Sequence, residues 1–212
     1  MPEHRFFAAI WDRMIAGSEK GGLADMRADL LRDASGRTLE LGAGTGHNLP
    51  HYTDAVVELV LTEPDRFMAA RLRDHLAAEP PAPASVKLVD AGAEQLPFED
   101  ASFDTVVATL VLCSVEDPER AAAEARRVLR PDGELLYLEH VRSPDSERLA
   151  RWQDRLERPW GWIAGGCHPN RSTDEMLSAA GFEIGRLKPD IFPKSGMTPW
   201  VRPLIVGSAR PT

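Results

Sequence analysis

The sequence reads Glu40-Leu41-Gly42-Ala43-Gly44-Thr45-Gly46 directly after a short apolar run. Glycines in such a loop let the backbone turn sharply and let a ligand approach more closely than a Cβ atom would permit. In the dinucleotide fingerprint G-x-G-x-x-G the third glycine would fall at position 47, but His47 stands there. The G-x-G-x-G spacing, with acidic Glu40 before it, therefore favours a ligand with a cationic amino-acid end over a diphosphate such as that of NAD.

Short apolar runs alternate with helix-like segments on the carboxyl side of this loop. Strands are predicted at 37–41, 56–61, 86–89, 103–109 and 134–141, with helices from Pro64 to about Ala78 and from Pro118 to Leu129. This alternation indicates βαβ units and a parallel sheet covered by helices on both faces. Two later runs, 182–187 and 204–209, are expected to extend the sheet as a hairpin-like pair.

Composition and charge narrow the class of protein. The chain has 212 residues, 43% hydrophobic and 27% charged, which is typical of one globular domain. We expect three parts within it, at 1–34, 35–141 and 142–212. A net charge of −8 argues against a nucleic-acid partner. Two cysteines and an apolar run of only ten residues, 106–115, favour a cytoplasmic location.

An acidic residue ends the second predicted strand. Glu63 lies 21 positions after Gly42, and a carboxylate about 20 residues past the loop is the expected ribose contact in nucleotide-binding α/β sheets. A glycine-rich turn alone is a weak signal. The loop, the strand order and Glu63 together predict a nucleoside ligand with an amino-acid end.

The chain resembles the class I S-adenosylmethionine-dependent methyltransferases, and within them the branch of quinone-biosynthesis and thiol methyltransferases. The segments that carry this resemblance are 40–46, 63–65, 93–98, 103–107 and 128–133, while 109–115 and 138–141 resemble the thiol-methylating members. The resemblance implies a Rossmann-like, seven-stranded, mostly parallel sheet with the last strand antiparallel. It also implies transfer of a methyl group from S-adenosyl-L-methionine to a small or lipophilic acceptor.

The resemblance assigns cofactor roles to residues along the core, 35–141, which the helical cap 1–34 and the substrate-side segment 142–212 flank. The glycine loop would hold the methionine part, Glu40 its ammonium group and Glu63 the ribose. Met68 would pack on the adenine or serve as plain core, and Gly92 stands where the branch usually has an acidic adenine ligand. The complete set of expected cofactor contacts is Glu40, Gly42, Ala43, Gly44, Gly46, Glu63, Pro64, Met68, Gly92, Ala93, Glu94 and Leu110.

Methyl transfer from a sulfonium is mainly a matter of alignment, so few catalytic residues are expected. His140 ends the fifth predicted strand, where ligands bind in open α/β sheets, and it is the candidate base. Glu139 points to the opposite face. His47 and His51 are weaker candidates. His168 lies in a loop just before a helix that Ser172 is expected to cap with Glu175 three positions later, and a mobile substrate loop is the functional alternative.

Three alternatives remain open at this point. The spacing of four candidate ligands matches no zinc pattern of paired close ligands, so no metal is expected; they are Cys113, Cys167, His140 and His168. The amphipathic segment 145–158 is expected to have a solvated face, with peripheral membrane contact through Trp152 as the alternative. The acceptor is expected to be a thiol or another small apolar molecule, with a quinone ring carbon, a phospholipid amine or cofactor binding without catalysis as the alternatives.

Overall fold

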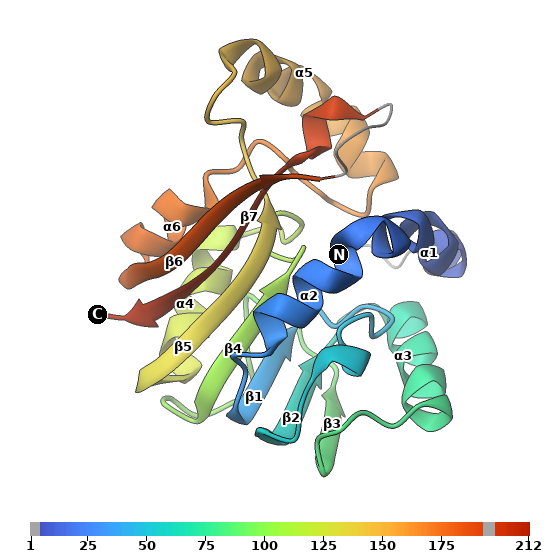
Figure 1. The fold of residues 1–212 in the computed structure, drawn as a ribbon, viewed down its shortest axis with the longest axis vertical. Helices are drawn as coiled ribbons and strands as arrows, with labels where there is room; N and C mark the ends of the chain where they lie inside the picture. The colour runs from blue at the N-terminus through green and yellow to red at the C-terminus, as the bar shows by residue number, and fades with distance from the viewer. Residues whose placement is uncertain (1–4, 193–197) are drawn as a thin grey trace.

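Residues 5–192 and 198–212 are described by the computed structural model, except for the side chains of residues 5–10 and 14. The strands are β1 Gly36–Leu41, β2 Val56–Thr62, β3 Ser85–Val89, β4 Phe103–Thr109, β5 Leu129–His140, β6 Phe182–Ile191 and β7 Pro203–Pro211. They form one sheet in the order β3-β2-β1-β4-β5-β7-β6 (Figure 1). β7 runs antiparallel to both β5 and β6, whereas the pairs from β3 to β5 are parallel. The predicted sheet, with its antiparallel last strand, is confirmed.

Helices cover both faces of this sheet. They are α1 Arg5–Ser18, α2 Ala24–Leu31, α3 Arg66–Ala78, α4 Pro118–Val128, α5 Glu147–Ile163 and α6 Thr173–Ala179. In Figure 1, α2 crosses the near face while α4 and α6 lie behind the sheet. Successive strand residues point to opposite faces, so Val107 of β4 packs in the same cluster as Leu30 of α2, and Val106 packs with Ala122 of α4.

The N-terminal segment is helical, as predicted, but it contains a kink. The π-helical turn η1, Glu19–Leu23, joins α1 to α2, and Gly22 within it has φ +122°. Glycine adopts this conformation without the steric cost of a side chain. Phe6, Phe7, Ile10, Trp11 and Met14 have helical spacing in the sequence, and of these side chains the described part of the structure includes that of Trp11.

Two predicted boundaries differ from the structure for local reasons. β5 begins at Leu129 rather than at 134, and its pairing with β4 shifts from Phe103↔Leu129 to Thr105↔Glu134, so residues 130–133 form an irregularity inside the strand. α3 begins at Arg66 rather than at Pro64, because the Asp65 side chain caps it by accepting from the Phe67 and Met68 N–H groups.

The segment after β5 also departs from expectation. α5 starts at Glu147 and continues past Pro159 to Ile163, where the sequence predicted an end near Arg158. The helix gains packing beyond the proline, since the Trp160 ring meets Trp200 of the 3₁₀ turn η3, Pro199–Val201, edge to face at 5.9 Å. The predicted capping box of α6 is wrong: Ser172 occupies the cap position, but its side chain makes no capping hydrogen bond to the described helix.

None of the helices in residues 5–192 and 198–212 is long and apolar enough to span a membrane.

Candidate active site

The glycine loop lies at the carboxyl end of β1 and adopts a backbone that only glycine tolerates easily. Gly42 has φ +53°, and a Cβ atom there would lie 3.0 Å from Val111 Cγ2. Gly44 has φ +58°, and a Cβ atom there would meet nothing within 4 Å. The loop therefore packs tightly on one side and leaves its Gly44 peptide open to a cavity on the other.

We call this space the glycine-loop cavity, and it lies between the loop, β2, β4 and the N-terminal helices. Its volume is about 140 Å³. It is lined by Trp11, Arg27, Glu40, Gly42, Ala43, Gly44, Thr45, His47, Asn48, Glu63, Asp65, Met68, Thr109, Leu110, Val111, Ser114, Val115, Ala164 and Gly165. Most of the residues that the resemblance assigned to the cofactor thus line one cavity.

Glu63 directly follows β2, and its carboxylate holds two backbone segments, the glycine loop and the turn before α3. Its Oε2 accepts the Gly44 N–H at 2.8 Å and its Oε1 accepts the Asp65 N–H at 2.8 Å. Burial raises the pKa of Glu63, while these two N–H donors favour its charged form. The carboxylate is therefore held in a fixed position in the wall of the cavity, next to the end of β2.

A polar network in the wall of the cavity contains the buried carboxyl of Glu40 and the buried guanidinium of Arg27. Glu40 accepts Asn48 Nδ2 at 2.9 Å and the Tyr52 hydroxyl at 2.7 Å. Arg27 of α2 donates to Asn48 Oδ1 at 2.8 Å and to Thr109 Oγ1 at 3.1 Å. Burial raises the pKa of Glu40 to about 7. One end of the cavity thus presents a carboxyl and a guanidinium, the complement of a zwitterion.

Arg27 is the functional candidate that sequence reasoning missed. Its side chain is only 5% exposed, and its Nε pairs with Glu19 at 3.1 Å. A buried arginine in an N-terminal helix leaves no motif in the sequence, because its partners Asn48 and Thr109 lie 21 and 82 residues away. The only signal was an arginine on a helix otherwise packed through leucines.

α1 forms part of the wall of the glycine-loop cavity. Asp12 accepts the Thr45 hydroxyl at 2.6 Å and Arg71 Nη1 at 3.0 Å, so one carboxylate joins α1 to both the loop and α3. His47 Nε2 lies 3.4 Å from the same carboxylate. The neighbouring Trp11 lines the cavity. The expected position of His47 beside the loop is therefore explained by its contact with α1.

The turn after β4 is strained and held by a buried acid. Leu110 has φ +60°, an unusual conformation for a residue with a side chain. Glu139 of β5, fully buried, accepts the N–H groups of Val111, Leu112 and Cys113 at 2.9–3.0 Å. Burial raises the pKa of Glu139 well above its ordinary range. Glu139 is thus committed to the backbone, and its neighbour His140 faces elsewhere, as strand alternation predicted.

A second space, which we call the cysteine cavity, adjoins the first. It has a volume of about 330 Å³ and is lined by Trp11, Ile15, Ser18, Leu23, Leu110, Cys113, Ser114, His140, Trp160, Ile163, Ala164, Cys167, Phe192, Thr198, Val201 and Leu204. Trp11, Leu110, Ser114 and Ala164 line both cavities. Taken as one joined space, the two cavities fall in the size range of small-molecule sites.

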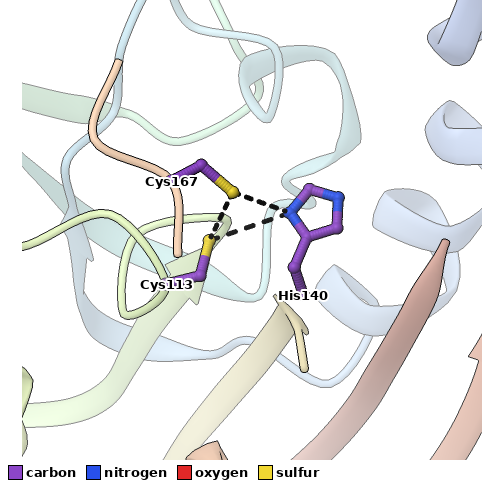
Figure 2. A group of neighbouring side chains, drawn as sticks. All are labelled: Cys113, His140 and Cys167. Atoms are coloured by element: carbon purple, nitrogen blue, oxygen red, sulfur yellow. Dashed lines mark hydrogen bonds between the residues drawn. The ribbon is translucent and has the colours of Figure 1, made fainter. Parts of the chain in front are cut away.

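His140 points into a cluster with two cysteines (Figure 2). Its Nδ1 lies 3.5 Å from Cys167 Sγ and 3.8 Å from Cys113 Sγ, and the two sulfurs are 3.9 Å apart. The contact with Cys167, followed by burial, raises the pKa of the Cys113 thiol well above its ordinary value. His168 stays outside this cluster, and its Nδ1 pairs with Glu157 at 2.9 Å. The fold therefore assembles three of the four side chains whose spacing along the chain suggested no metal site.

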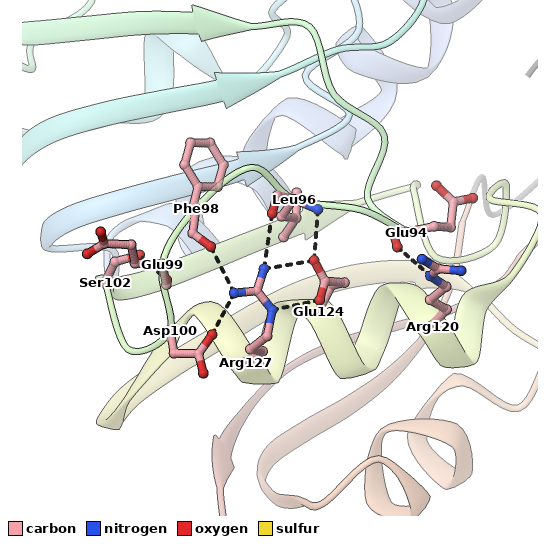
Figure 3. Close-up of polar contacts among 9 residues, drawn as sticks. All are labelled: Glu94, Leu96, Phe98, Glu99, Asp100, Ser102, Arg120, Glu124 and Arg127. Atoms are coloured by element: carbon pink, nitrogen blue, oxygen red, sulfur yellow. Dashed lines mark hydrogen bonds and ion pairs between the residues drawn. The ribbon is translucent and has the colours of Figure 1, made fainter.

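Five of the expected cofactor contacts do not line the glycine-loop cavity in the described structure: Gly46, Pro64, Gly92, Ala93 and Glu94. The last three follow one another between β3 and β4. Their segment is anchored from α4 instead (Figure 3). Arg127 donates to the Phe98 and Leu96 carbonyls and pairs with Glu124 and Asp100, while Arg120 donates to the Glu94 carbonyl. Contacts from 92–94 to an adenine stay a prediction.

Known proteins share this fold. A methyltransferase from Thermotoga maritima superimposes with a TM-score of 0.72 at 23% identity, covering 98% of both chains. The [4+2]-cyclase SpnF superimposes with a TM-score of 0.67 at 21% identity, covering 90% of this chain and 80% of its own. At these identities the likeness defines the fold, and that fold also serves a protein described as a cyclase.

Sequence relatives define the family. Residues 39–137 match the methyltransferase domain family. The chain is 30% identical to the thiol S-methyltransferase TMT1A of Homo sapiens over 96% of its own length and 82% of that protein. It is 33% identical to a ubiquinone/menaquinone biosynthesis C-methyltransferase of Vibrio cholerae over 77% of its own length and 72% of that protein. The chain belongs to the class I S-adenosylmethionine-dependent methyltransferases, whose methyl donor is S-adenosyl-L-methionine.

The match to a further group of relatives is partial. The chain is 35% identical to the thiol S-methyltransferase TMT1B of Rattus norvegicus over 71% of its own length, and this match spans 61% of that protein.

Proposed function

We propose that the protein transfers the methyl group of S-adenosylmethionine to the sulfur of a small apolar thiol. The observation that carries this proposal is the junction of the two cavities. One cavity has polar groups that suit a nucleoside with an amino-acid end, and the other is mostly apolar and contains His140 and two thiols. Leu110, on its strained turn, lies at the boundary, where the donor methyl and the acceptor sulfur would meet.

The proposed cofactor position follows from charge. Glu40 and Arg27 would bind the ammonium and carboxylate of the methionine part, and the open Gly44 peptide would admit its backbone-like chain. Glu63 would accept the ribose hydroxyls, since its carboxylate is already held in place by two N–H donors. Met68 lines the cavity one helical turn into α3 and would pack on the adenine. Gly42, Ala43 and Gly46 would complete the loop around the methionine part. Pro64 and residues 92–94 would lie at the outer edge of the cofactor site.

The proposed chemistry needs alignment and a thiolate. The acceptor sulfur would approach the methyl carbon on the side opposite the donor sulfur, and the cavity walls would hold that line. A free thiol has a pKa near 8.5, so a site that favours its thiolate form raises the reactive fraction at neutral pH. His140 is the sequence-predicted side chain in the cysteine cavity, and its proposed role is to favour that thiolate.

Two other acceptors have support from relatives of this chain. Curated proteins of 33–35% identity are named as a ubiquinone/menaquinone C-methyltransferase and a phosphatidylethanolamine N-methyltransferase. α5 exposes Trp162 by 93% and Ile163 by 64%, and Ile163 also lines the cysteine cavity, which would suit a lipid-borne acceptor. We place the thiol first because a relative named as a thiol S-methyltransferase matches 96% of this chain.

The test is a matched acceptor series with S-adenosylmethionine as donor. The series pairs an apolar alkyl or aryl thiol with its alcohol analogue, and includes a quinol and a phosphatidylethanolamine vesicle. We expect mass spectrometry to find the methyl thioether and one equivalent of S-adenosylhomocysteine from the thiol alone. Methylation of the quinol or the amine without the thioether would replace the proposed acceptor, and cofactor binding without any methylated product would reduce the protein to a binding role.

A further inference from the structure

Three metal-ligating atoms from distant segments meet in the wall of the cysteine cavity. They are Cys113 Sγ after β4, His140 Nδ1 at the end of β5 and Cys167 Sγ after α5, and all lie within 4.8 Å of one another. We propose that these three side chains form a zinc site whose open fourth position binds the sulfur of the thiol acceptor. This deepens the proposed function and rests on it for the identity of the fourth ligand.

The spacing of the three atoms fits the edges of a zinc tetrahedron. With Zn–S bonds of about 2.3 Å and Zn–N bonds of about 2.0–2.1 Å, tetrahedral angles place two sulfurs about 3.8 Å apart and a sulfur and a nitrogen about 3.6 Å apart. The structure has 3.9 Å between the sulfurs and 3.5 and 3.8 Å from the sulfurs to His140 Nδ1. The triangle therefore accepts an ion without movement of the backbone.

The backbone, and not the thiols themselves, brings the two cysteines together. The His168 N–H donates to the Cys113 carbonyl at 2.6 Å. Arg171 donates to the Leu112 and Val115 carbonyls at 2.5 and 2.7 Å. A Cβ atom at Gly166 would lie 2.8 Å from the Ser114 carbonyl, so the loop approaches closely only because glycine stands there. This scaffold positions the ligands as a preorganised metal site requires.

Ligand number and position make this site catalytic in type. Structural zinc sites have four protein ligands, whereas catalytic ones have three and leave one position for water or substrate, with two cysteines and one histidine as an established set. All three ligands line the cysteine cavity, so the fourth position faces the space proposed for the acceptor. Two thiolates and a neutral imidazole balance the two positive charges of the ion.

The chemical step balances with the acceptor as the fourth ligand. The thiol loses its proton to solvent on binding, and its sulfur becomes a thiolate held by the ion. A sulfur electron pair forms the new C–S bond to the methyl carbon while the donor C–S⁺ bond breaks, leaving its electron pair on neutral S-adenosylhomocysteine. The product thioether carries no charge and is displaced by the next thiol. In this arrangement His140 favours the thiolate through the ion and does not itself accept the proton.

Metal content is the first test. Protein from cells grown with zinc and purified under reducing conditions should carry about one zinc per chain by inductively coupled plasma mass spectrometry. Cys113→Ser, Cys167→Ser or His140→Gln should each reduce the zinc content to near zero. His168→Gln is the matched control, because this histidine adjoins Cys167 but pairs with Glu157, and it should keep the ion. Unchanged circular dichroism and S-adenosylhomocysteine binding establish that the variants fold. A wild type that lacks zinc and does not bind it when titrated would overturn the site.

Cobalt substitution tests the fourth position separately from activity. Co²⁺ should produce the sulfur-to-metal charge-transfer band and the visible bands of a tetrahedral ion, and an apolar thiol should shift the visible bands while its alcohol analogue should not. Cobalt bands unmoved by any thiol would contradict the acceptor role. Full thiol methylation after metal removal would also overturn this role and leave the proposed function standing. Zinc binding without methylation of any thiol would overturn the proposed function and the acceptor role together, and would leave only the three-ligand metal site standing. A Cys113–Cys167 disulfide in protein that binds no zinc after reduction would replace the metal site with a redox pair.

Discussion

Glu40 is a buried acid whose titration lies close to neutral pH, and this has a consequence for cofactor affinity. Burial raises its pKa to about 7, so below pH 7 the carboxyl is mostly protonated. A bound ammonium group favours the charged form, so binding at low pH must release this proton. Affinity for S-adenosylhomocysteine should therefore rise with pH up to about 7, by at most about tenfold per unit, and then level.

Calorimetry across this pH range measures the effect, and Glu40→Gln should flatten the profile as well as weaken binding. The glutamine keeps the contacts to Tyr52 and Asn48 in part, so the loop should stay folded. A slope in the variant equal to that of the wild type would assign the pH dependence to another group.

Glu63 should contribute to binding through the ribose. Glu63→Ala removes a charged acceptor from two hydroxyls, and we expect S-adenosylhomocysteine to bind about 1.5–3 kcal/mol more weakly by calorimetry. Glu183→Ala, an exposed acid on β6, is the control and should have no effect. Because Glu63 also accepts the Gly44 N–H, part of the loss would come from the loop. Methionine, which has no ribose, separates the two contributions. Its affinity, measured by competition with S-adenosylhomocysteine, should fall in Glu63→Ala only by the part of the loss that comes from the loop.

At the scale of elements, the turn after β4 depends on one carboxylate. Glu139→Ala would leave the N–H groups of Val111, Leu112 and Cys113 without their acceptor in a fully buried place. We expect the free energy of unfolding in urea to fall by about 3 kcal/mol or more. Glu183→Ala again serves as the comparison, with a change within about 0.5 kcal/mol. A small loss for Glu139→Ala would show that water replaces the carboxylate, contrary to its burial.

The strands of this protein could be predicted because their signal is local. The runs at 103–109 and 204–209 each contain three consecutive apolar residues, at 106–108 and 204–206, and the structure places strands there. The errors occur where tertiary contacts outweigh local preference. Pro159 is unfavourable inside a helix, yet packing of Trp160 on Trp200 extends α5 beyond it. Ser172 has the sequence of a capping box, but its side chain does not adopt the capping arrangement.

The candidate site shows the same division between local and distant information. The loop at Gly42 and the acid at Glu63 are recognisable because they directly follow β1 and β2, two parallel neighbours in the sheet that are close in sequence. The Cys113, His140 and Cys167 cluster is not, because its members lie 27 residues apart and meet only after the sheet has formed. Spacing rules for zinc describe ligands that share a short loop, and these ligands do not.

At the scale of the molecule, α1 is attached to the body through Asp12. Asp12→Ala removes the contacts to Thr45 and Arg71. The Asp12 side chain is 28% exposed, so the cost in stability should stay near 1 kcal/mol. Dissociation of S-adenosylhomocysteine, followed by stopped flow, should become faster by several-fold, because the helix that covers the cavity is released. Arg13→Ala, on the exposed side of the same helix, should leave the rate unchanged.

Trp11 lines both cavities, and α1 joins the rest of the chain through the kink at Gly22. Any swing of this helix exposes donor and acceptor sites together, so both products would leave in a single opening event. If that event limits turnover, as it does in many enzymes, acceptors of very different reactivity should reach the same kcat. Their discrimination should then appear only in competition, as a difference in kcat/KM.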